Sequence, residues 1–192
     1  GRKTKAKGGF TGIQKNPDGS KTKLVLDWKT GERRPKTSYT YPSLGKARKT
    51  NDVRTRIKDL VNSDDRAGIF AWALLRDTLA YTSRRVGEIS DTLVDVDNSL
   101  KWGFNWALGP FETWDALGLV KSVDKMKEDG FVIPENIRHM LEAGHSSFYK
   151  TEQGRRLFYD FTSAAYKPVQ MSANIISLAG LIFFLKKFNS LL

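Results

Sequence analysis

The sequence predicts a mainly α-helical bundle preceded by a basic segment with a small β-hairpin. Three observations lead to this prediction. Several short segments have proline near their start and glycine just past their end, which is typical of packed helices. A longer segment repeats apolar residues three and four positions apart. The basic residues are concentrated at the N-terminal end, so we expect a basic arm, hairpin and linker over residues 1–42 and a helical domain over 43–192.

The composition is that of an ordinary globular protein. Of the 192 residues, 40% are hydrophobic and 28% are charged. Because cysteine is absent and only two histidines occur, a disulfide framework and thiolate chemistry are excluded and a zinc site is disfavoured. The longest apolar run, Ala179–Leu185, is shorter than the about 20 residues that cross a membrane. We therefore expect a cytoplasmic protein that makes no membrane contact.

The positive charge of the chain lies in its first third. Of a net charge of +11, the first 60 residues contribute +12, from 17 Lys and Arg against 5 Asp and Glu. One interpretation is a binding module for anionic partners, such as nucleic acid or the phosphates of a coenzyme. The other is a solvated linker rich in lysine, which we favour because aromatic residues for base stacking are sparse there.

The N-terminal segment carries the signals of a hairpin. The sequence Asn16-Pro17-Asp18-Gly19 favours a type I turn between two β-prone flanks, and Thr30-Gly31-Glu32 is a second turn. Residues Pro35–Pro42 have no periodicity and are expected to form an extended linker. Because an isolated hairpin is marginal in water, we expect it to lie on the helical body or on another domain.

Two helices are expected after the linker. Ser43 is the expected N-cap of a helix over Leu44–Val61, and Ser63-Asp64-Asp65 begins a central helix that runs to about Asp91. One face of the central helix carries apolar spacing at Trp72, Leu75, Leu79, Thr82, Val86 and Ile89. A second row is expected to widen the buried surface and comprises Phe70, Ala73 or Leu74, and Tyr81.

A glycine–proline corner follows. Gly103 is expected to end a short helix that starts after Asp95, and Pro110 to open the next helix, with Glu112 in its first turn and Gly118 as its end. The bulky apolar residues around this corner should form a compact core, with the indole N–H groups finding partners; they are Phe104, Trp106, Leu108, Phe111, Trp114 and Leu117.

The remaining elements are short. Helices are expected over Leu119–Asp129, ended by Gly130, and over Pro134–Ala143, ended by Gly144. The aromatic residues near 148–161 predict a second hairpin, which Lys167-Pro168 breaks. The apolar stretch from Ile175 onward is expected to form a short helix.

The corner carries a recognisable motif: Gly103-Phe104-x-Trp106-x-x-Gly109-Pro110-Phe111-Glu112-x-Trp114-Asp115-x-x-Gly118. It resembles the helical C-terminal domain of the 3-hydroxyacyl-CoA dehydrogenase family, as do Ser83–Ile89 and Asp95–Asp97 upstream. The likeness is closest to the second copy of this domain in long β-oxidation proteins. Those proteins carry an NAD-binding domain before it and often an enoyl-CoA hydratase domain after it.

The resemblance implies an architectural role within a larger enzyme of lipid metabolism. The parent would oxidise 3-hydroxyacyl-CoA with NAD, and the second repeat would pack on the first helical domain and imitate the dimer partner of single-copy relatives. The aromatic face of Trp102, Phe104, Trp106 and Phe111 would supply that contact. The expected partners are therefore the parent's NAD-binding and first helical domains, its acyl-CoA substrate and, where present, a hydratase domain. An isolated segment could instead form a homodimer through the same face.

The sequence predicts no catalytic, cofactor-binding or metal-binding residue in this segment, and NAD only in the parent. No Gly-x-Gly-x-x-Gly follows a strand, and Gly8-Gly9-x-x-Gly12 has the wrong context. His139 and His145 are interpreted as surface or capping residues. The family places an asparagine near the reacting carbonyl, and Leu79 or Thr78 falls at that position here, which indicates that the role is lost.

Two neighbouring carboxylates are the remaining candidates for chemistry. Glu112 and Asp115 lie three apart on one helix face, a spacing that paired acid–base groups could use. The structural interpretation is favoured: Glu112 complements a helix start, and Asp115 pairs with Arg84 or Arg85. Arg84-Arg85 near Glu88 is likewise expected to be a helix ion pair.

Overall fold

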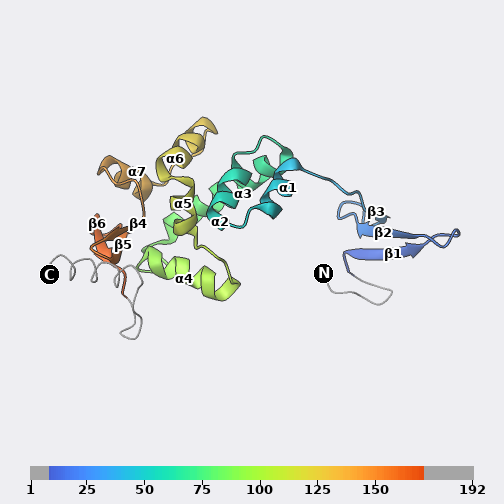
Figure 1. Cartoon of the computed structure of the whole chain (residues 1–192), viewed down its shortest axis with the longest axis horizontal. Coiled ribbons are helices and arrows are strands. Elements are labelled where there is room, and N and C mark those ends of the chain that lie inside the picture. Colours follow the sequence, from blue (N-terminus) through green and yellow to red (C-terminus); the bar gives the residue numbers. More distant parts are fainter. Residues whose placement is uncertain (1–8, 171–192) are drawn as a thin grey trace, which may run out of the picture. The chain divides into compact units, whose positions relative to one another are not determined.

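The computed structural model describes residues 9–170 (Figure 1). Within that range the chain forms seven helices and two three-stranded antiparallel sheets, which confirms the predicted mainly α-helical class. The chain divides into two compact units, Gly1–Thr40 and Tyr41–Leu192. The helix expected from Ile175 onward lies outside the described residues, as does the start of the basic arm.

The first unit holds one sheet, made of β1 (Thr11–Lys15), β2 (Lys21–Leu26) and β3 (Arg33–Pro35). The Gly19 amide donates to the Asn16 carbonyl oxygen at 3.0 Å and closes the predicted turn. The expected hairpin is therefore present, and a third strand extends it. No described residue of this unit is buried, so the sheet has no core of its own there. That this hairpin lies on the helical domain or on another domain stays a prediction.

Two helices, α1 (Pro42–Lys49) and α2 (Val53–Val61), replace the single helix that the sequence predicted here. The backbone is extended at Thr50, with ψ 112°, and at Asp52, with ψ 120°. The Asp52 carboxylate then accepts a hydrogen bond from the Thr55 amide at 2.8 Å and begins α2. The prediction of one continuous helix was wrong because the chain is extended between Thr50 and Asp52, and Asp52 then caps a new helix.

Ser43 does not cap α1 as predicted, because Pro42 already occupies the first turn. Its backbone amide and its hydroxyl instead donate to the Asp65 carboxylate at 2.9 and 2.7 Å. Asp65 also accepts from the Gly68 amide at 3.0 Å, and so caps the next helix, α3 (Arg66–Arg85). The bonds from Ser43 and Gly68 hold the pKa of Asp65 below its usual value. One carboxylate thus joins α1 to the start of α3.

The central helix α3 ends earlier than the predicted end at Asp91. Its last helical residue is Arg85, because Gly87 adopts a φ of 87° and Val86 bridges to Ser90. A glycine adopts this left-handed conformation without the steric cost that a Cβ brings. The turn that follows carries Ile89 away from the core, and the residue is 71% exposed.

The two apolar rows of α3 differ in how far they are buried. The first row is buried as predicted, at Trp72, Leu79 and Thr82. The second row was expected to be buried too, but Phe70, Leu74 and Tyr81 are 67, 58 and 60% exposed. These three residues are called the α3 stripe below.

The corner joins α4 (Leu93–Phe104) to α5 (Pro110–Leu117). The prediction that Gly103 ends α4 was wrong, since the left-handed residue is Asn105, with φ 56° and ψ 37°. Asparagine tolerates this conformation because its short polar side chain can bond locally. Pro110 opens α5 and Gly118, with φ 90°, follows it, as predicted.

Two short helices and a second sheet complete the chain. The helices α6 (Leu119–Glu128) and α7 (Glu135–Glu142) lie where the sequence placed them, each followed by a glycine with positive φ. The sheet consists of β4 (Tyr149–Glu152), β5 (Arg155–Asp160) and β6 (Ala165–Pro168).

The first two strands of this sheet are the predicted second hairpin. The prediction that Lys167-Pro168 breaks the structure was wrong, because both residues lie in β6. Pro168 is opposite Leu157 of β5. Since β6 is an edge strand, a proline without an N–H donor is tolerated there.

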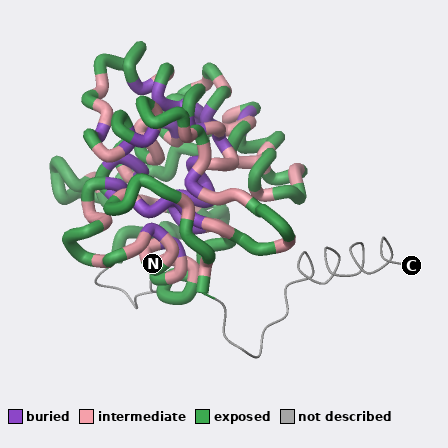
Figure 2. The backbone as a smooth tube through the Cα atoms, turned by 90° about the vertical axis from the view of Figure 1, so that its left-hand side faces the viewer, coloured by how far each residue is buried: buried purple, intermediate pink, exposed green. Residues whose placement is uncertain are grey.

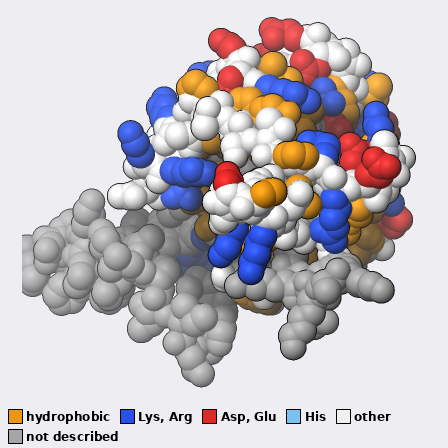
Figure 3. Space-filling model, turned by 90° about the vertical axis from the view of Figure 1, so that its right-hand side faces the viewer, with side chains coloured by type: hydrophobic (Ala, Val, Ile, Leu, Met, Phe, Trp, Pro, Cys, Tyr) orange, Lys and Arg blue, Asp and Glu red, His pale blue; other side chains and the backbone are white. Residues whose placement is uncertain are grey.

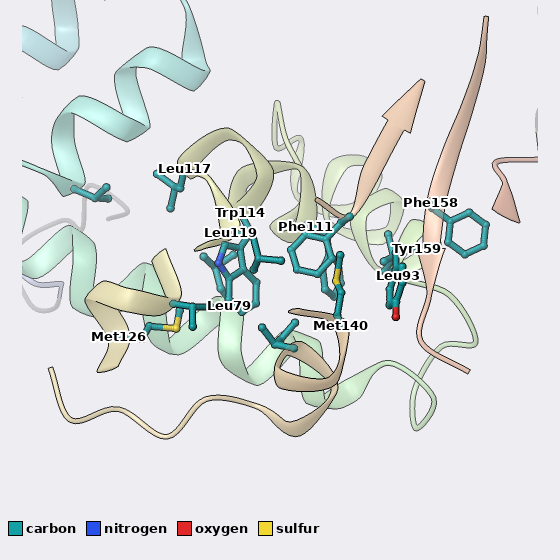
Figure 4. Close-up of a cluster of buried hydrophobic side chains, with 14 of the residues drawn as sticks. Leu79, Leu93, Phe111, Trp114, Leu117, Leu119, Met126, Met140, Phe158 and Tyr159 are labelled. Carbon is teal, nitrogen blue, oxygen red and sulfur yellow. The ribbon is translucent and has the colours of Figure 1, made fainter. Parts of the chain in front are cut away.

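The core lies in the second unit around α5 (Figure 4). Phe111 and Trp114 are 0% exposed, and both rings contact Phe148, with centroids 4.9 and 5.4 Å away. Side chains from the surrounding helices and from β5 close over them, namely Leu79, Leu93, Leu119, Met126, Met140, Phe158 and Tyr159. Figure 2 shows the buried residues on inner turns of the tube and the exposed ones on outer loops.

The corner residues are only partly in this core. Leu117 is buried with Phe111 and Trp114, whereas Phe104 and Trp106 are 71 and 43% exposed, against expectation. Of the buried indoles, that of Trp72 donates to Asp129 at 2.7 Å, and that of Trp114 finds no partner in the described part of the chain. In residues 9–170 no helix has the length and apolar character that a bilayer crossing requires.

Two glycines of the motif are expected to differ in how much stability the protein loses when each is replaced by alanine. A Cβ on Gly109 would lie 2.3 Å from Cγ of Asp97, whereas nothing lies within 4 Å of one on Gly103. Gly109→Ala is expected to lower the free energy of unfolding by about 1–3 kcal/mol, because it overpacks a buried site. Gly103→Ala is expected to change it by less than about 0.5 kcal/mol. Urea unfolding followed by circular dichroism measures both, and equal effects would contradict the close approach.

Candidate functional site

A polar cluster joins the α4–α5 corner to the second sheet. Asp97 comes from α4, Glu112 and Asp115 from α5, and Tyr149 and Arg156 from β4 and β5. Glu112 and Asp115 are brought together by helical spacing, as predicted. We call these five residues the carboxylate clamp.

Asp97 is the centre of the clamp and is 0% exposed. Its carboxylate accepts from the Phe111 and Glu112 amides at 2.8 and 3.2 Å, at the N-terminus of α5, and from the Tyr149 hydroxyl at 2.8 Å. Burial raises the pKa of Asp97 to about 6, against the hydrogen bonds, which favour the charged form. Burial and the nearby Asp97 charge also raise the pKa of Tyr149, so this residue stays a phenol and a donor.

Glu112 completes a capping box at the start of α5. Its carboxylate accepts from the Gly109 amide at 2.9 Å, which confirms its predicted role at the helix start. It also pairs with Lys101 at 3.0 Å and Arg156 at 2.7 Å. Burial by itself would raise its pKa, but the bonds from Gly109, Arg156 and Lys101 outweigh burial and hold the pKa below its usual value.

Asp115 fastens the second sheet to α5. It accepts from the Phe148 and Tyr149 amides at 2.8 and 2.9 Å, and burial raises its pKa to about 6. The predicted pairing of Asp115 with Arg84 or Arg85 was wrong. Arg85 pairs with the predicted partner Glu88 at 2.7 Å, although Glu88 lies in the turn after α3, and Arg84 donates to the Val132 carbonyl oxygen at 3.2 Å.

The clamp is built to hold elements together. Each carboxylate accepts two or three hydrogen bonds from protein donors, and these bonds fix α4, α5 and the second sheet to one another. A pocket of about 250 Å³ beside the clamp is lined by both acidic and basic side chains; the charged ones are Arg54, Glu112, Asp115, Lys150 and Arg156. Its charges therefore largely offset one another.

The other candidate residues are also in structural settings. His139 is exposed on α7, 3.7 Å from Glu135, and His145 lies against the rings of Tyr159 and Tyr166. Leu79 is 1% exposed within the core. The hydroxyl of its neighbour Thr78 donates to the Leu74 carbonyl oxygen at 2.8 Å. Across residues 9–170, no three acidic or histidine side chains are grouped as a metal site requires.

An apolar groove of about 410 Å³ lies between α2 and α3, beside the α4–α5 corner. We call it the α2–α3 groove; its apolar lining includes Val53, Ile57, Leu60, Ala71, Leu74, Leu75, Trp106 and Leu108. Leu74 belongs both to this groove and to the α3 stripe. The groove and the stripe therefore form one continuous apolar surface. Figure 3 shows one face of the protein, on which apolar side chains reach the surface among Lys and Arg.

Some of the motif residues are exposed and others are buried in the interior. Gly109, Pro110, Phe111, Glu112 and Trp114 are buried. Asp115 and Gly118 are half-buried, and Gly103, Phe104 and Trp106 are exposed. The predicted contact face therefore keeps Trp106, Phe104 and Trp102, the last 81% exposed, but loses Phe111, which is 0% exposed.

Sequence reasoning missed Asp97, Tyr149 and Arg156 as members of the site. Asp97 was part of the recognised Asp95–Asp97 segment, but no local pattern indicates that its carboxylate is buried. The signal available was the glycine at 109, which permits a close approach that a Cβ would block. Tyr149 is 52 residues from its partner Asp97, so no spacing rule connects them.

The fold and the clamp define a helical domain with a small sheet fastened to it. No protein-family model matches the chain, and no solved structure is significantly similar to it. A curated protein of Bacillus subtilis (strain 168), a probable 3-hydroxyacyl-CoA dehydrogenase, is 37% identical over 161 residues. The match covers 84% of this chain and 20% of that protein, so the chain spans about a fifth of its relative. The chain is therefore homologous to a segment of a 3-hydroxyacyl-CoA dehydrogenase, which confirms the family indicated by the motif.

The raised pKa of Asp97 predicts a pH-dependent contribution to stability. Its folded pKa of about 6 lies above the ordinary value of 3.8, so the folded state binds the proton more tightly. The contribution is full below about pH 4 and is lost as the pH rises through about 6. Lowering the pH from 7 to 5 is expected to increase the advantage of the wild type over Asp97→Asn by on the order of 1 kcal/mol.

Urea unfolding of both proteins at several pH values measures this difference. Comparing the two proteins removes the effects of the other titrating groups, because they are common to both. A difference that stays constant, or shrinks, as the pH falls from 7 to 5 would contradict the prediction, because it would mean that Asp97 remains charged in the folded state throughout this range.

Proposed function

We propose that this chain is the helical packing segment of a larger, NAD-dependent 3-hydroxyacyl-CoA dehydrogenase of cytoplasmic fatty-acid β-oxidation. Its role is to pack against the preceding helical domain of the same polypeptide, in place of a dimer partner. The segment itself contributes no catalytic and no NAD-binding residue. The observation that carries this proposal is the apolar surface formed by the α3 stripe and the α2–α3 groove.

The α3 stripe has the pattern of a second buried face. Phe70, Leu74 and Tyr81 recur at helical spacing, on a helix whose opposite face already lies in the core. A helix that is apolar on two faces is normally covered on both. Exposed aromatic and aliphatic side chains in one continuous patch are typical of an interaction site. Within the described residues of the second unit, nothing buries this row.

Size and connectivity favour the rest of the parent polypeptide as the occupant. The matched region is 20% of the related dehydrogenase, so most of such a protein lies outside this segment. A neighbour joined by a covalent linker is present at a high effective concentration, which lets a modest apolar patch hold it. The groove offers a concave, apolar lining beside an exposed indole, Trp106, suited to an apolar helix of a neighbouring repeat.

The polar groups of the segment support a role without chemistry. The three carboxylates of the clamp are engaged in holding α5 and the second sheet. The position at which the family carries a carbonyl-facing asparagine corresponds to buried Leu79 or to its neighbour Thr78, whose hydroxyl donates to the Leu74 carbonyl oxygen at 2.8 Å. Leucine has neither donor nor acceptor, so it cannot orient a substrate hydroxyl. The chemistry of the proposed enzyme would therefore reside in its other domains.

The test is association of this chain with the separately produced preceding part of its parent polypeptide, measured by calorimetry. The wild-type chain is expected to bind. Phe70→Glu is expected to weaken binding by about tenfold or more, because burying a phenyl ring contributes about 1.5–3 kcal/mol. Val132→Glu is the matched control, since Val132 is 76% exposed and lies outside the groove and the stripe.

Three results would contradict the proposal. The first is binding that Phe70→Glu leaves unchanged, and the second is self-association of the chain in preference to binding its parent. The third is turnover of acetoacetyl-CoA with NADH by the purified chain alone, since the segment is proposed to lack catalytic groups.

A further inference from the structure

Three lysines line a single pocket of about 260 Å³ in the second unit. Lys58 comes from the last turn of α2, and Lys121 and Lys125 come from α6. The floor includes Val61, Trp72 and Leu117, all of which are buried. No Asp or Glu belongs to the lining. We call this site the lysine pocket.

The charges of this pocket are not neutralised from within the described part of the chain. No salt bridge there involves Lys58 or Lys121. Lys125 donates to the Val61 carbonyl oxygen at 2.7 Å and lies 4.7 Å from the centre of the Trp72 ring, so its ammonium is held at the floor.

Asp59, Asp124 and Asp129, which lie near these lysines in the sequence, have other partners. Asp59, beside Lys58, pairs with Lys46 at 2.8 Å, and Asp124 pairs with Lys127 at 3.5 Å. Asp129 attracts Lys125, but its carboxylate already accepts from the Trp72 indole and from Arg76, at 2.7 and 3.0 Å. None of these carboxylates lines the pocket.

Such a grouping is unfavourable for the protein alone. Lys121 and Lys125 are four residues apart and therefore lie on the same face of α6, where like charges repel. Lys58 adds a third positive charge from another helix to the same concave space. The buried apolar floor lowers the local dielectric and strengthens the positive field. The polar pocket beside the clamp differs, because Glu112 and Asp115 offset the cations there.

We propose that the lysine pocket binds a phosphate-type oxyanion, either free or as the phosphate end of a small molecule. Ammonium groups bind phosphate oxygens as point charges through short, charge-assisted hydrogen bonds. Three of them from two helices can surround one anionic group. The pocket is smaller than the about 300–1,000 Å³ of sites for drug-sized ligands, so the part held inside is compact. Lys121 is the main ligand, because it is exposed and makes no ion pair or hydrogen bond through its side chain to any residue of the range 9–170.

The test is calorimetric titration of the purified chain with inorganic pyrophosphate and, separately, with ADP, at about 0.15 M salt, where the Debye length is about 8 Å. Pyrophosphate is expected to bind, and Lys121→Glu to weaken its affinity by about tenfold or more, because a charge-assisted bond is lost and a repulsive charge added. Lys127→Glu is the matched control. It makes the same change of charge on the same helix, but Lys127 is outside the pocket lining. Its affinity is expected to stay within about twofold of the wild type, since exposed distant charges are screened.

The two probes separate the sources of the anion. Binding of pyrophosphate alone indicates a free anion, and binding of both indicates that the pocket accepts the phosphate end of a larger molecule; either supports the proposal. Lys121→Met, checked by circular dichroism, shows that lost affinity does not arise from misfolding. Absence of pyrophosphate binding would overturn the proposal. So would equal weakening by Lys127→Glu, because the basic chain as a whole would then attract the anion.

Discussion

The second unit depends on a buried carboxylate at the N-terminus of a buried helix. Asp97 reaches from α4 to the first amides of α5 and to the Tyr149 hydroxyl of β4, so one side chain connects three elements. The contact requires Gly109, since a Cβ there would overlap Asp97. It places α5 so that Phe111 and Trp114 fill the core, while Glu112 and Asp115 fasten the second sheet from the other side of the same helix. Without these bonds the polar ends of α5 and β4 would be buried without partners, which is costly.

Local features could be predicted from the sequence, and features that depend on distant partners could not. Pro110, Gly118 and Gly130 mark helix ends through their own backbone preferences, and all three lie where expected. Where two residues could serve, the choice was missed: Asn105 rather than Gly103 takes the left-handed position. The contacts between α4, α5 and the second sheet in the clamp could not be predicted, because they join residues 15 to 52 positions apart through packing and not through a spacing rule.

The same distinction applies to the candidate functional surface. The periodicity of α3 correctly identified two apolar rows, but periodicity cannot tell which body covers each row. The row with Leu79 is covered within this unit, and the row with Phe70 is not. The proposal that this segment packs against its neighbours rests on the exposed row, on the apolar groove, and on the match to a fifth of a related dehydrogenase. Its lysine pocket is a separate feature, because it lies on α2 and α6 and needs no neighbouring domain.

The most direct test of the account is a double-mutant cycle between Asp97→Asn and Tyr149→Phe, measured by urea unfolding at pH 7. The two residues meet at 2.8 Å in a buried site, so the effects of the single substitutions should not add. We predict a coupling energy of about 1 kcal/mol or more, as for a buried hydrogen bond to a charged group. Additive effects, with a coupling below about 0.5 kcal/mol, would show that Asp97 does not hold the sheet to the helices.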